Sequence, residues 1–310
     1  MDSRNWTIAT ELILLGFSTN RNVNLALFPL FFVMYVITFV GNGLMIFIIF
    51  FNPRLHIPMY FFLCILSVLD LSYSSTVVPK LLEDLLSVRG LISIRGCAMQ
   101  LYMILLLGGT ECLLLALMAY DRYVAICRPL HYTVLMRWSV CYILTAFMCT
   151  ASFVIYLLPS LLMPLELCYP NQINHFVCEV LAVIKLACGN IYLSELVIFS
   201  TSFISLLLPF VFIIVSYVCI ICSVLKVHSA GRSKAFSTCT SHISVVSLFF
   251  GTSMIMYFGP SSQYSSNQQK YVSLFYVVVS PMLNPLIYSL NNREVKRTFV
   301  KVFSSLDVSR

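Results

Sequence analysis

The sequence predicts an all-α integral membrane protein, a bundle of seven transmembrane helices with an extracellular N-terminus. Two observations support this fold class: 60% of the 310 residues are hydrophobic while only 10% are charged, and the mean hydropathy is +0.92. A soluble domain usually carries about 45–50% apolar and about 25% charged residues, so most of this chain needs lipid as its solvent. The same composition excludes a disordered chain. It also argues against nucleic-acid binding, for which the net charge of +7 would have to gather on one exposed face.

Seven stretches have the roughly 20 apolar residues that a helix needs to cross a bilayer. Membrane β-strands would instead alternate in polarity over about 10 residues, and the run from Phe28 to Val40 is apolar without alternation. The predicted spans are Leu25 to Phe50, Pro58 to Leu82, Cys97 to Cys127, Ser139 to Met163, Ser194 to Val227, Ser237 to Pro260 and Tyr271 to Leu290.

These spans predict a single domain over residues 1–310, without an internal repeat. It divides into an extracellular tail (1–24), the seven-helix bundle (25–290) and a cytoplasmic tail (291–310). Within the cytoplasmic tail, Arg293 to Lys301 is predicted to form a short amphipathic helix, whose basic residues contact membrane lipid at the inner leaflet.

The distribution of Lys and Arg gives the orientation, because short cytoplasmic loops collect positive charge. With the N-terminus outside, the cytoplasmic segments hold 12 of the 19 basic residues against three acids, whereas the outer segments hold seven basic residues against seven acids. Asn5 begins the only Asn-x-Ser/Thr triplet of the chain. A glycan on Asn5 requires the tail to face the lumen, in agreement with this orientation.

Four cysteines fall on the predicted outer side: Cys97, Cys168, Cys178 and Cys188. Four cysteines allow three pairings, and the spacing does not choose among them. Three of the four lie in the long outer connection from Pro164 to Leu193. Long loops are usually functional or disordered, and the cysteines favour a loop pinned down as a lid.

Two carboxylates lie at similar depth inside predicted spans, Asp70 in the second and Glu111 in the third. Ionisable groups within a membrane span usually have a function. The pair would share a proton or hold a monovalent cation; the alternative is a protonated, hydrogen-bonded core pair without further role. Asn42 and Asn284 are the expected polar partners.

Asp121 and Arg122 are adjacent at the inner end of the third span. Neighbouring residues on a helix do not face each other fully, so we interpret the pair as a latch in which Asp121 restrains Arg122. The alternative is an arginine whose long side chain simply reaches the membrane surface.

Two prolines interrupt predicted spans, Pro209 in the fifth and Pro285 in the seventh. Proline removes one helical hydrogen bond and kinks the helix. The carbonyl freed by Pro285 needs a new partner, for which Asn284 or water is expected. The seventh span therefore has a predicted hinge.

Several short motifs, in order on successive spans, resemble the rhodopsin-like family of G-protein-coupled receptors. They are Gly41-Asn42, Leu66 to Asp70, Asp121-Arg122-Tyr123 and Asn284-Pro285-x-x-Tyr288. Further strings resemble the odorant receptors: Pro58 to Leu63, Met118 to Pro129, Ser216-Tyr217, Lys234 to His242 and Pro281 to Pro285. Leu130-His131-Tyr132 resembles their tetrapod-type class. The resemblance covers essentially the whole chain.

The resemblance implies a disulfide between Cys97 and Cys178, which leaves Cys168 to pair with Cys188. It implies a buried ion-coupled site at Asp70 and Glu111, and no other cofactor. The implied activation switch, at the face that binds the G protein, comprises Asp121, Arg122, Tyr123, Tyr217, His242, Asn284, Pro285 and Tyr288. Two positions depart from the family pattern: Phe250 replaces a usual Tyr, and Asn291 replaces a usual Arg.

The outer halves of the third, fifth and sixth spans predict a small apolar cavity with a few hydroxyl groups. The outer half of the third span, Leu101 to Thr110, has no acid that could neutralise an amine. Residues on the cavity side repeat at helical spacing. For any one of them helix packing is the better explanation, and only the resemblance to the family supports the set. The candidate ligand-binding residues are Leu105, Gly108, Gly109, Cys112, Ser202, Ser205, Phe250, Ser253 and Tyr257. Among these, the Tyr257 hydroxyl is expected to donate to an oxygen acceptor on the ligand.

The expected function is therefore that of an odorant receptor. It would bind small, mostly apolar, neutral molecules and activate a stimulatory heterotrimeric G protein at the plasma membrane of olfactory cilia, raising cyclic AMP. A transporter would be expected to show repeated halves, and none is visible. A membrane enzyme would need a nucleophile and base at one depth, and His242 has no second histidine on its span.

Overall fold

The computed structural model describes residues 10–162, 166–188, 191–226, 229–258, 266–291 and 295. The glycosylation site at Asn5 lies outside these residues, as does the predicted cytoplasmic helix Arg293 to Lys301 apart from Val295. Both therefore stay predictions.

The described residues contain seven helices long and apolar enough to cross a membrane, which confirms the predicted number of spans. The first three are α1 (Arg21–Phe51), α2 (Pro58–Leu86) and α3 (Ile94–Cys127). The fourth consists of α5 (Trp138–Ser152), η3 (Phe153–Leu157) and α6 (Leu158–Leu162). The fifth and sixth are α8 (Tyr192–Leu225) and α9 (Ser229–Phe258), and the seventh consists of α10 (Ser266–Leu274), η5 (Phe275–Val279) and α11 (Ser280–Asn291).

Short helices fill the connections between the spans: η1 (Pro53–Leu55), η2 (Pro129–His131), α4 (Tyr132–Leu135), α7 (Val180–Val183) and η4 (Ile184–Leu186). Local sequence fixes where the long helices begin. Asn20 caps α1 by accepting from the Asn22 amide, Ser93 caps α3 by accepting from the Gly96 amide, and Pro58 occupies the first turn of α2. Each residue suits a helix start, because the first amides of a helix lack helical partners.

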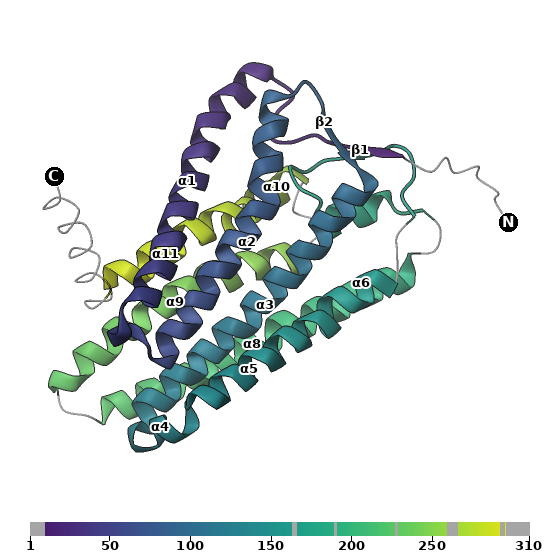
Figure 1. The fold of residues 1–310 in the computed structure, drawn as a ribbon. Helices are drawn as coiled ribbons and strands as arrows, with labels where there is room; N and C mark the ends of the chain where they lie inside the picture. Colours follow the sequence, from purple (N-terminus) through teal and green to yellow (C-terminus); the bar gives the residue numbers. More distant parts are fainter. Residues whose placement is uncertain are drawn as a thin grey trace, which may run out of the picture.

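A small β-sheet at one end of the bundle was not predicted from the sequence. Its strands are β1 (Glu11–Leu14), β2 (Gly90–Ser93) and β3 (Gln172–Ile173), in the order β2-β1-β3. Strand β1 is antiparallel to β2 and parallel to β3. The sheet lies near α10 and at the opposite end of the bundle from α4 (Figure 1). It ties the N-terminal segment to the two outer connections.

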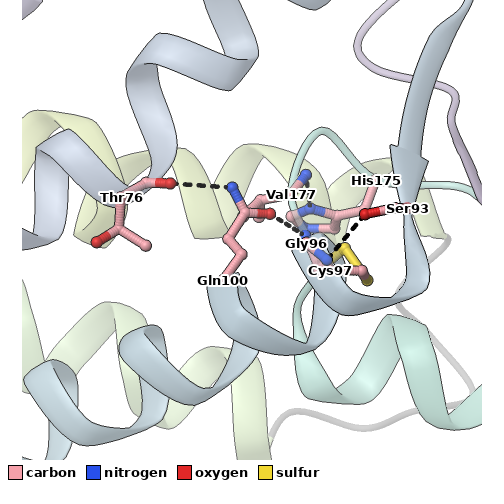
Figure 2. The surroundings of a disulfide bond; sticks show 8 residues. Thr76, Ser93, Gly96, Cys97, Gln100, His175 and Val177 are labelled. Carbon is pink, nitrogen blue, oxygen red and sulfur yellow. Dashed lines mark hydrogen bonds between the residues drawn. A yellow bond between two sulfur atoms is a disulfide. The ribbon is translucent and has the colours of Figure 1, made fainter.

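Both implied disulfides are present, Cys97 to Cys178 and Cys168 to Cys188. Gln100 supports the first bridge: its Oε1 accepts from the Cys178 amide at 3.0 Å and its Nε2 donates to the Thr76 carbonyl at 3.1 Å (Figure 2). The first bridge therefore holds the long outer connection against α3, as the interpretation of a pinned loop requires, and the second closes a loop within that connection. They lie at the end of the bundle that carries β1, which agrees with an extracellular N-terminus.

Breaking the first bridge is expected to cost more stability than breaking the second. The Cys97–Cys178 bridge closes a loop of sequence separation 81, against 20 for Cys168–Cys188, and loop-closure entropy makes the longer loop worth about 1 kcal/mol more within a typical total of about 2–5 kcal/mol. We expect Cys97→Ser to reduce surface delivery more than Cys188→Ser, measured by antibody staining of intact cells. Equal surface levels for the two variants would contradict this ranking.

The proline of the seventh span is accommodated by α1. Pro285 has no amide hydrogen, so the Pro281 carbonyl loses its helical donor. The Asn42 side chain replaces that donor, with its Nδ2 at 3.0 Å from the Pro281 oxygen. A Cβ on the adjacent Gly41 would lie 3.0 Å from Pro285 Cγ, so glycine permits this close approach. The expectation that Asn284 serves the freed carbonyl is wrong, because the Asn284 amide is bonded elsewhere.

Candidate functional site

A cavity of about 280 Å³ lies in the half of the bundle that carries the disulfides. Its walls come from α3, η3 and α6, α8, α9 and η5. Helix α2 contributes Tyr73, and the loop helix α7 contributes Val180 and Val183. This volume is near the lower end of small-molecule pockets, which run from about 300 to about 1,000 Å³. The cavity therefore suits a small organic molecule.

The structure brings nearly all of the predicted ligand-binding residues to this cavity. Those that line it are Leu105, Gly108, Gly109, Cys112, Ser202, Ser205, Ser253 and Tyr257. Phe250 is not among the lining residues. It is 0% exposed and packs its ring against Phe210 and Phe249, at centroid distances of 5.6 and 5.4 Å.

Phe249 lines the cavity in place of Phe250. On a helix, Phe249 shares a face with Ser253 and Tyr257 at spacings of four and eight, while Phe250 shares that face at spacings of three and seven. Both spacings are helical, so the sequence pattern alone does not separate the two rings.

Sequence reasoning missed four tyrosines that line the cavity: Tyr73, Tyr102, Tyr156 and Tyr276. Two of them come from π-helical turns, Tyr156 in η3 and Tyr276 in η5. A π-turn inserts one residue into the helical repeat, which changes the face that later residues occupy. A pattern based on 3.6 residues per turn therefore does not predict that Tyr156 and Tyr276 face the cavity.

Gly108 and Gly109 have different surroundings although both line the cavity. A Cβ on Gly108 would meet only Tyr73 Cε2, at the ordinary distance of 3.7 Å. A Cβ on Gly109 would overlap the ring of Tyr156. Gly108 thus leaves open space in the wall, while Gly109 lets Tyr156 lie directly on α3.

His175 fastens the outer loop to the seventh span. Its Nδ1 accepts from the Val177 amide at 3.2 Å, so the ring proton lies on Nε2, which donates to Ser273 Oγ at 3.1 Å. Burial and the nearby Lys270 charge lower the pKa of His175 to about 3. The ring is neutral at physiological pH, and this contact does not depend on pH there.

The buried carboxylates in the middle of the bundle have different partners. Asn284 Nδ2 donates to both oxygens of Asp70 at 3.1 Å, whereas Asn42 bonds to backbone carbonyls instead. Glu111 Oε1 is buried and has no hydrogen-bond partner among the described residues. No group of three or more His, Cys, Asp or Glu side chains suited to a metal occurs in the described part of the chain.

At the inner end of α3, Arg122 Nη2 donates to Asp121 Oδ2 at 2.6 Å. The Arg122 side chain is 12% exposed, so most of it is buried in the protein beside Asp121. Tyr132, which sequence reasoning did not select as a site residue, donates its hydroxyl to Asp121 Oδ1 at 2.8 Å. Burial and the Asp121 charge raise the pKa of Tyr132, so this hydroxyl stays protonated.

A second contact joins α3, α8 and α9. His242 Nε2 donates to the Leu115 carbonyl at 3.1 Å, and in the neutral ring Nδ1 accepts from the Tyr217 hydroxyl at 2.7 Å. The Tyr288 hydroxyl is buried without a hydrogen-bond partner among the described residues. Tyr123 is half-buried next to Tyr120, at a centroid distance of 6.5 Å.

The comparisons with known proteins agree over nearly the whole chain. A family model described as "Olfactory receptor" matches residues 31–306. The chain is 46% identical over 304 residues to Olfactory receptor 2A5 of Homo sapiens, covering 97% of both chains. It is 45% identical over 304 residues to Olfactory receptor 2A7 of Mus musculus, covering 96% of this chain and 97% of that protein. The chain belongs to the olfactory receptor family.

The fold of this olfactory receptor is that of a rhodopsin-like G-protein-coupled receptor. The crystal structure of squid rhodopsin superposes with a TM-score of 0.73 at 17% sequence identity, covering 93% of this chain and 87% of that one. The receptor is a multi-pass membrane protein and a signalling receptor rather than an enzyme. Its ligand is a small molecule and its cytoplasmic partner a G protein, as is general for the family.

The two departures from the family pattern differ in their structural context. Phe250 of this olfactory receptor is enclosed by Phe210 and Phe249, so it offers neither a hydroxyl nor a ring face to a ligand. Asn291 is the last residue of α11, where a helix end favours basic side chains. An asparagine there lacks that favourable charge.

Proposed function

We propose that this olfactory receptor binds small, mostly apolar, neutral odorants in the cavity between α3, α6, α8 and α9. The observation that carries the proposal is the lining of that cavity, in which no Lys, Arg, Asp or Glu occurs among the described residues. Apolar walls with a few hydroxyl groups suit an uncharged organic molecule. The location fits a volatile molecule that reaches the receptor from outside the cell.

The odorant acts by binding one arrangement of the helices more tightly than another. It contacts the outer halves of α3, α8 and α9, and the same helices are joined further in by His242, Tyr217 and the Leu115 carbonyl. An odorant that favours separation of the inner ends must break these two bonds. Separation would open a site for a stimulatory G protein, which raises cyclic AMP.

Asp70 and Glu111 are the proposed site for a shared proton or a monovalent cation. Their oxygen atoms suit a hard cation such as sodium, and the buried Glu111 Oε1 lacks a hydrogen-bond partner among the described residues. Asn284 orients the Asp70 carboxylate from α11. A proton or cation bound here would couple α2, α3 and α11.

The receptor is expected at the plasma membrane of olfactory sensory cilia. A chemically diverse panel of volatiles, applied to cells with a cyclic AMP reporter, tests the function directly. At least one volatile should raise cyclic AMP. Responses that need a transmembrane gradient of the compound would favour a transporter instead.

The position of the odorant is tested by Gly108→Phe. The ring would occupy the open space beside Leu105 and Tyr73, so we expect every agonist of the wild-type receptor to lose its response while surface staining is retained. A wild-type response from Gly108→Phe would place the odorant outside this cavity.

A further inference from the structure

Glu179 is a buried acid at the outer end of the cavity that the proposed function does not use. It follows the disulfide-bonded Cys178 and precedes α7, and it is 1% exposed. Its Oε1 accepts a hydrogen bond from the Tyr257 hydroxyl at 3.3 Å. Its Oε2 has no hydrogen-bond partner among the described residues.

No basic side chain among the described residues forms an ion pair with Glu179. The charge of Lys185 acts on Glu179, but the Lys185 Nζ donates to Gln269 Oε1 at 3.3 Å. Burial raises the pKa of the Glu179 carboxyl to about 7. A substantial share of the receptor therefore carries the ionised carboxylate at neutral pH, and a carboxylate only accepts hydrogen bonds.

The contact with Glu179 determines what Tyr257 offers to a ligand. A tyrosine hydroxyl has one proton and two lone pairs. Tyr257 lines the cavity, and while Glu179 is ionised its carboxylate accepts the single Tyr257 proton in a hydrogen bond. The remaining capacity of this oxygen is to accept.

The electrostatics around Glu179 act in the same direction. Tyr73 and Tyr276, which also line the cavity, lie within electrostatic range of the Glu179 carboxylate. A negative charge behind this wall attracts the positive end of a donor group on the ligand and repels an oxygen lone pair. A donor group on a ligand would therefore be favoured near Tyr257 while Glu179 is ionised.

We propose that Glu179 is a positioning residue that holds Tyr257 as a hydrogen-bond acceptor, so that the receptor favours odorants bearing a hydroxyl group over matched ketones. This inference rests on the proposed odorant cavity. It reverses the sequence-based expectation that Tyr257 donates to an oxygen acceptor, because that expectation did not include the contact between the outer loop and α9.

The test uses three agonists with one carbon skeleton, a secondary alcohol, the corresponding ketone and the hydrocarbon, in a cyclic AMP reporter assay. The wild-type receptor should respond to the alcohol at lower concentration than to the ketone. Tyr257→Phe should lower the potency of the alcohol roughly two- to twelve-fold, the range expected for the loss of one neutral hydrogen bond. The same substitution should leave the ketone and the hydrocarbon unchanged.

Glu179→Met frees the Tyr257 proton for the ligand, so the ketone should gain potency and the ratio of alcohol to ketone potency should fall toward one. Glu166→Met is the matched control, since Glu166 lies exposed in the same loop. The ratio of alcohol to ketone potency in this variant should equal that of the wild type. Both variants are compared at equal surface staining. If Glu179→Met does not reach the surface, Tyr257→Phe alone decides.

Two results would overturn the role of Glu179. One is a wild-type receptor that responds to the ketone at lower concentration than to the alcohol. The other is a Tyr257→Phe receptor in which the potency of the ketone falls more than that of the alcohol. A ratio unchanged in both Tyr257→Phe and Glu179→Met would also overturn it. These outcomes differ from failure of the odorant function itself, in which no member of the series raises cyclic AMP in the wild-type receptor.

Discussion

Replacing Arg122 by alanine is expected to abolish odorant-driven cyclic AMP signalling while the receptor still reaches the cell surface. Arg122 lies at the inner end of α3, far along the helix from the cavity residues Leu105 and Gly108. Its loss leaves the proposed odorant site intact but removes the cation expected to meet the G protein. The measurement is the maximal reporter response at saturating agonist, normalised to surface staining.

Replacing Asp121, the partner of Arg122, should have the opposite effect and increase signalling. Asp121→Asn weakens the 2.6 Å contact that holds the arginine. A hydrogen bond between charged groups contributes about 1.5–3 kcal/mol, so its loss should raise the ratio of active to inactive receptor by roughly 10- to 150-fold. Signalling without odorant should therefore rise.

Tyr132→Phe gives a graded comparison, because it removes only the bond to Asp121 Oδ1 and should raise basal signalling less than Asp121→Asn. Arg54→Ala, at an exposed arginine of η1, is the control for loss of one cytoplasmic charge. Normal signalling by Arg122→Ala at normal surface levels would refute the assigned role.

The seven spans follow from the seven long apolar stretches of the sequence, since each span needs about 20 apolar residues in lipid. The predicted third span, Cys97 to Cys127, differs from α3 by only three residues at its start. The extracellular sheet was missed because β1 and β2 have four residues each and β3 has two. Strands this short carry too little alternation to be recognised, and their pairing depends on loops far apart in the sequence.

Long-range partners were harder to predict than the elements that carry them. Asn42 and Asn284 were both expected near the buried acids, yet Asn42 serves the Pro281 carbonyl across the bundle. The bond between Tyr257 and Glu179 joins residues 78 positions apart. Helical spacing gives the face of a residue, but it does not give the rotation of one helix against another.

Among substitutions that add only a methyl group to the cavity wall, Gly109→Ala is expected to reduce stability and agonist potency most. The new Cβ would overlap the Tyr156 ring, which is itself buried and held in the π-turn η3. Either the fourth span moves away from α3 or the ring turns into the cavity. Overpacking of this kind costs about 1–3 kcal/mol, and a ring in the cavity would displace the odorant. We expect lower thermal stability in detergent and a loss of potency of roughly tenfold or more, equivalent to about 1.4 kcal/mol.

Gly108→Ala is the matched control on the adjacent residue, because its methyl group would meet Tyr73 only at 3.7 Å. Alanine is also favoured over glycine inside a helix by about 1 kcal/mol, so this variant should be at least as stable as the wild type. Combining Gly109→Ala with Tyr156→Leu should restore much of the lost stability, since the second change removes the ring that the methyl group overlaps. Such a rescue is a non-additive effect of residues in contact. Equal stability of the two alanine variants, or no rescue in the double variant, would show that Tyr156 does not pack on Gly109 in the membrane.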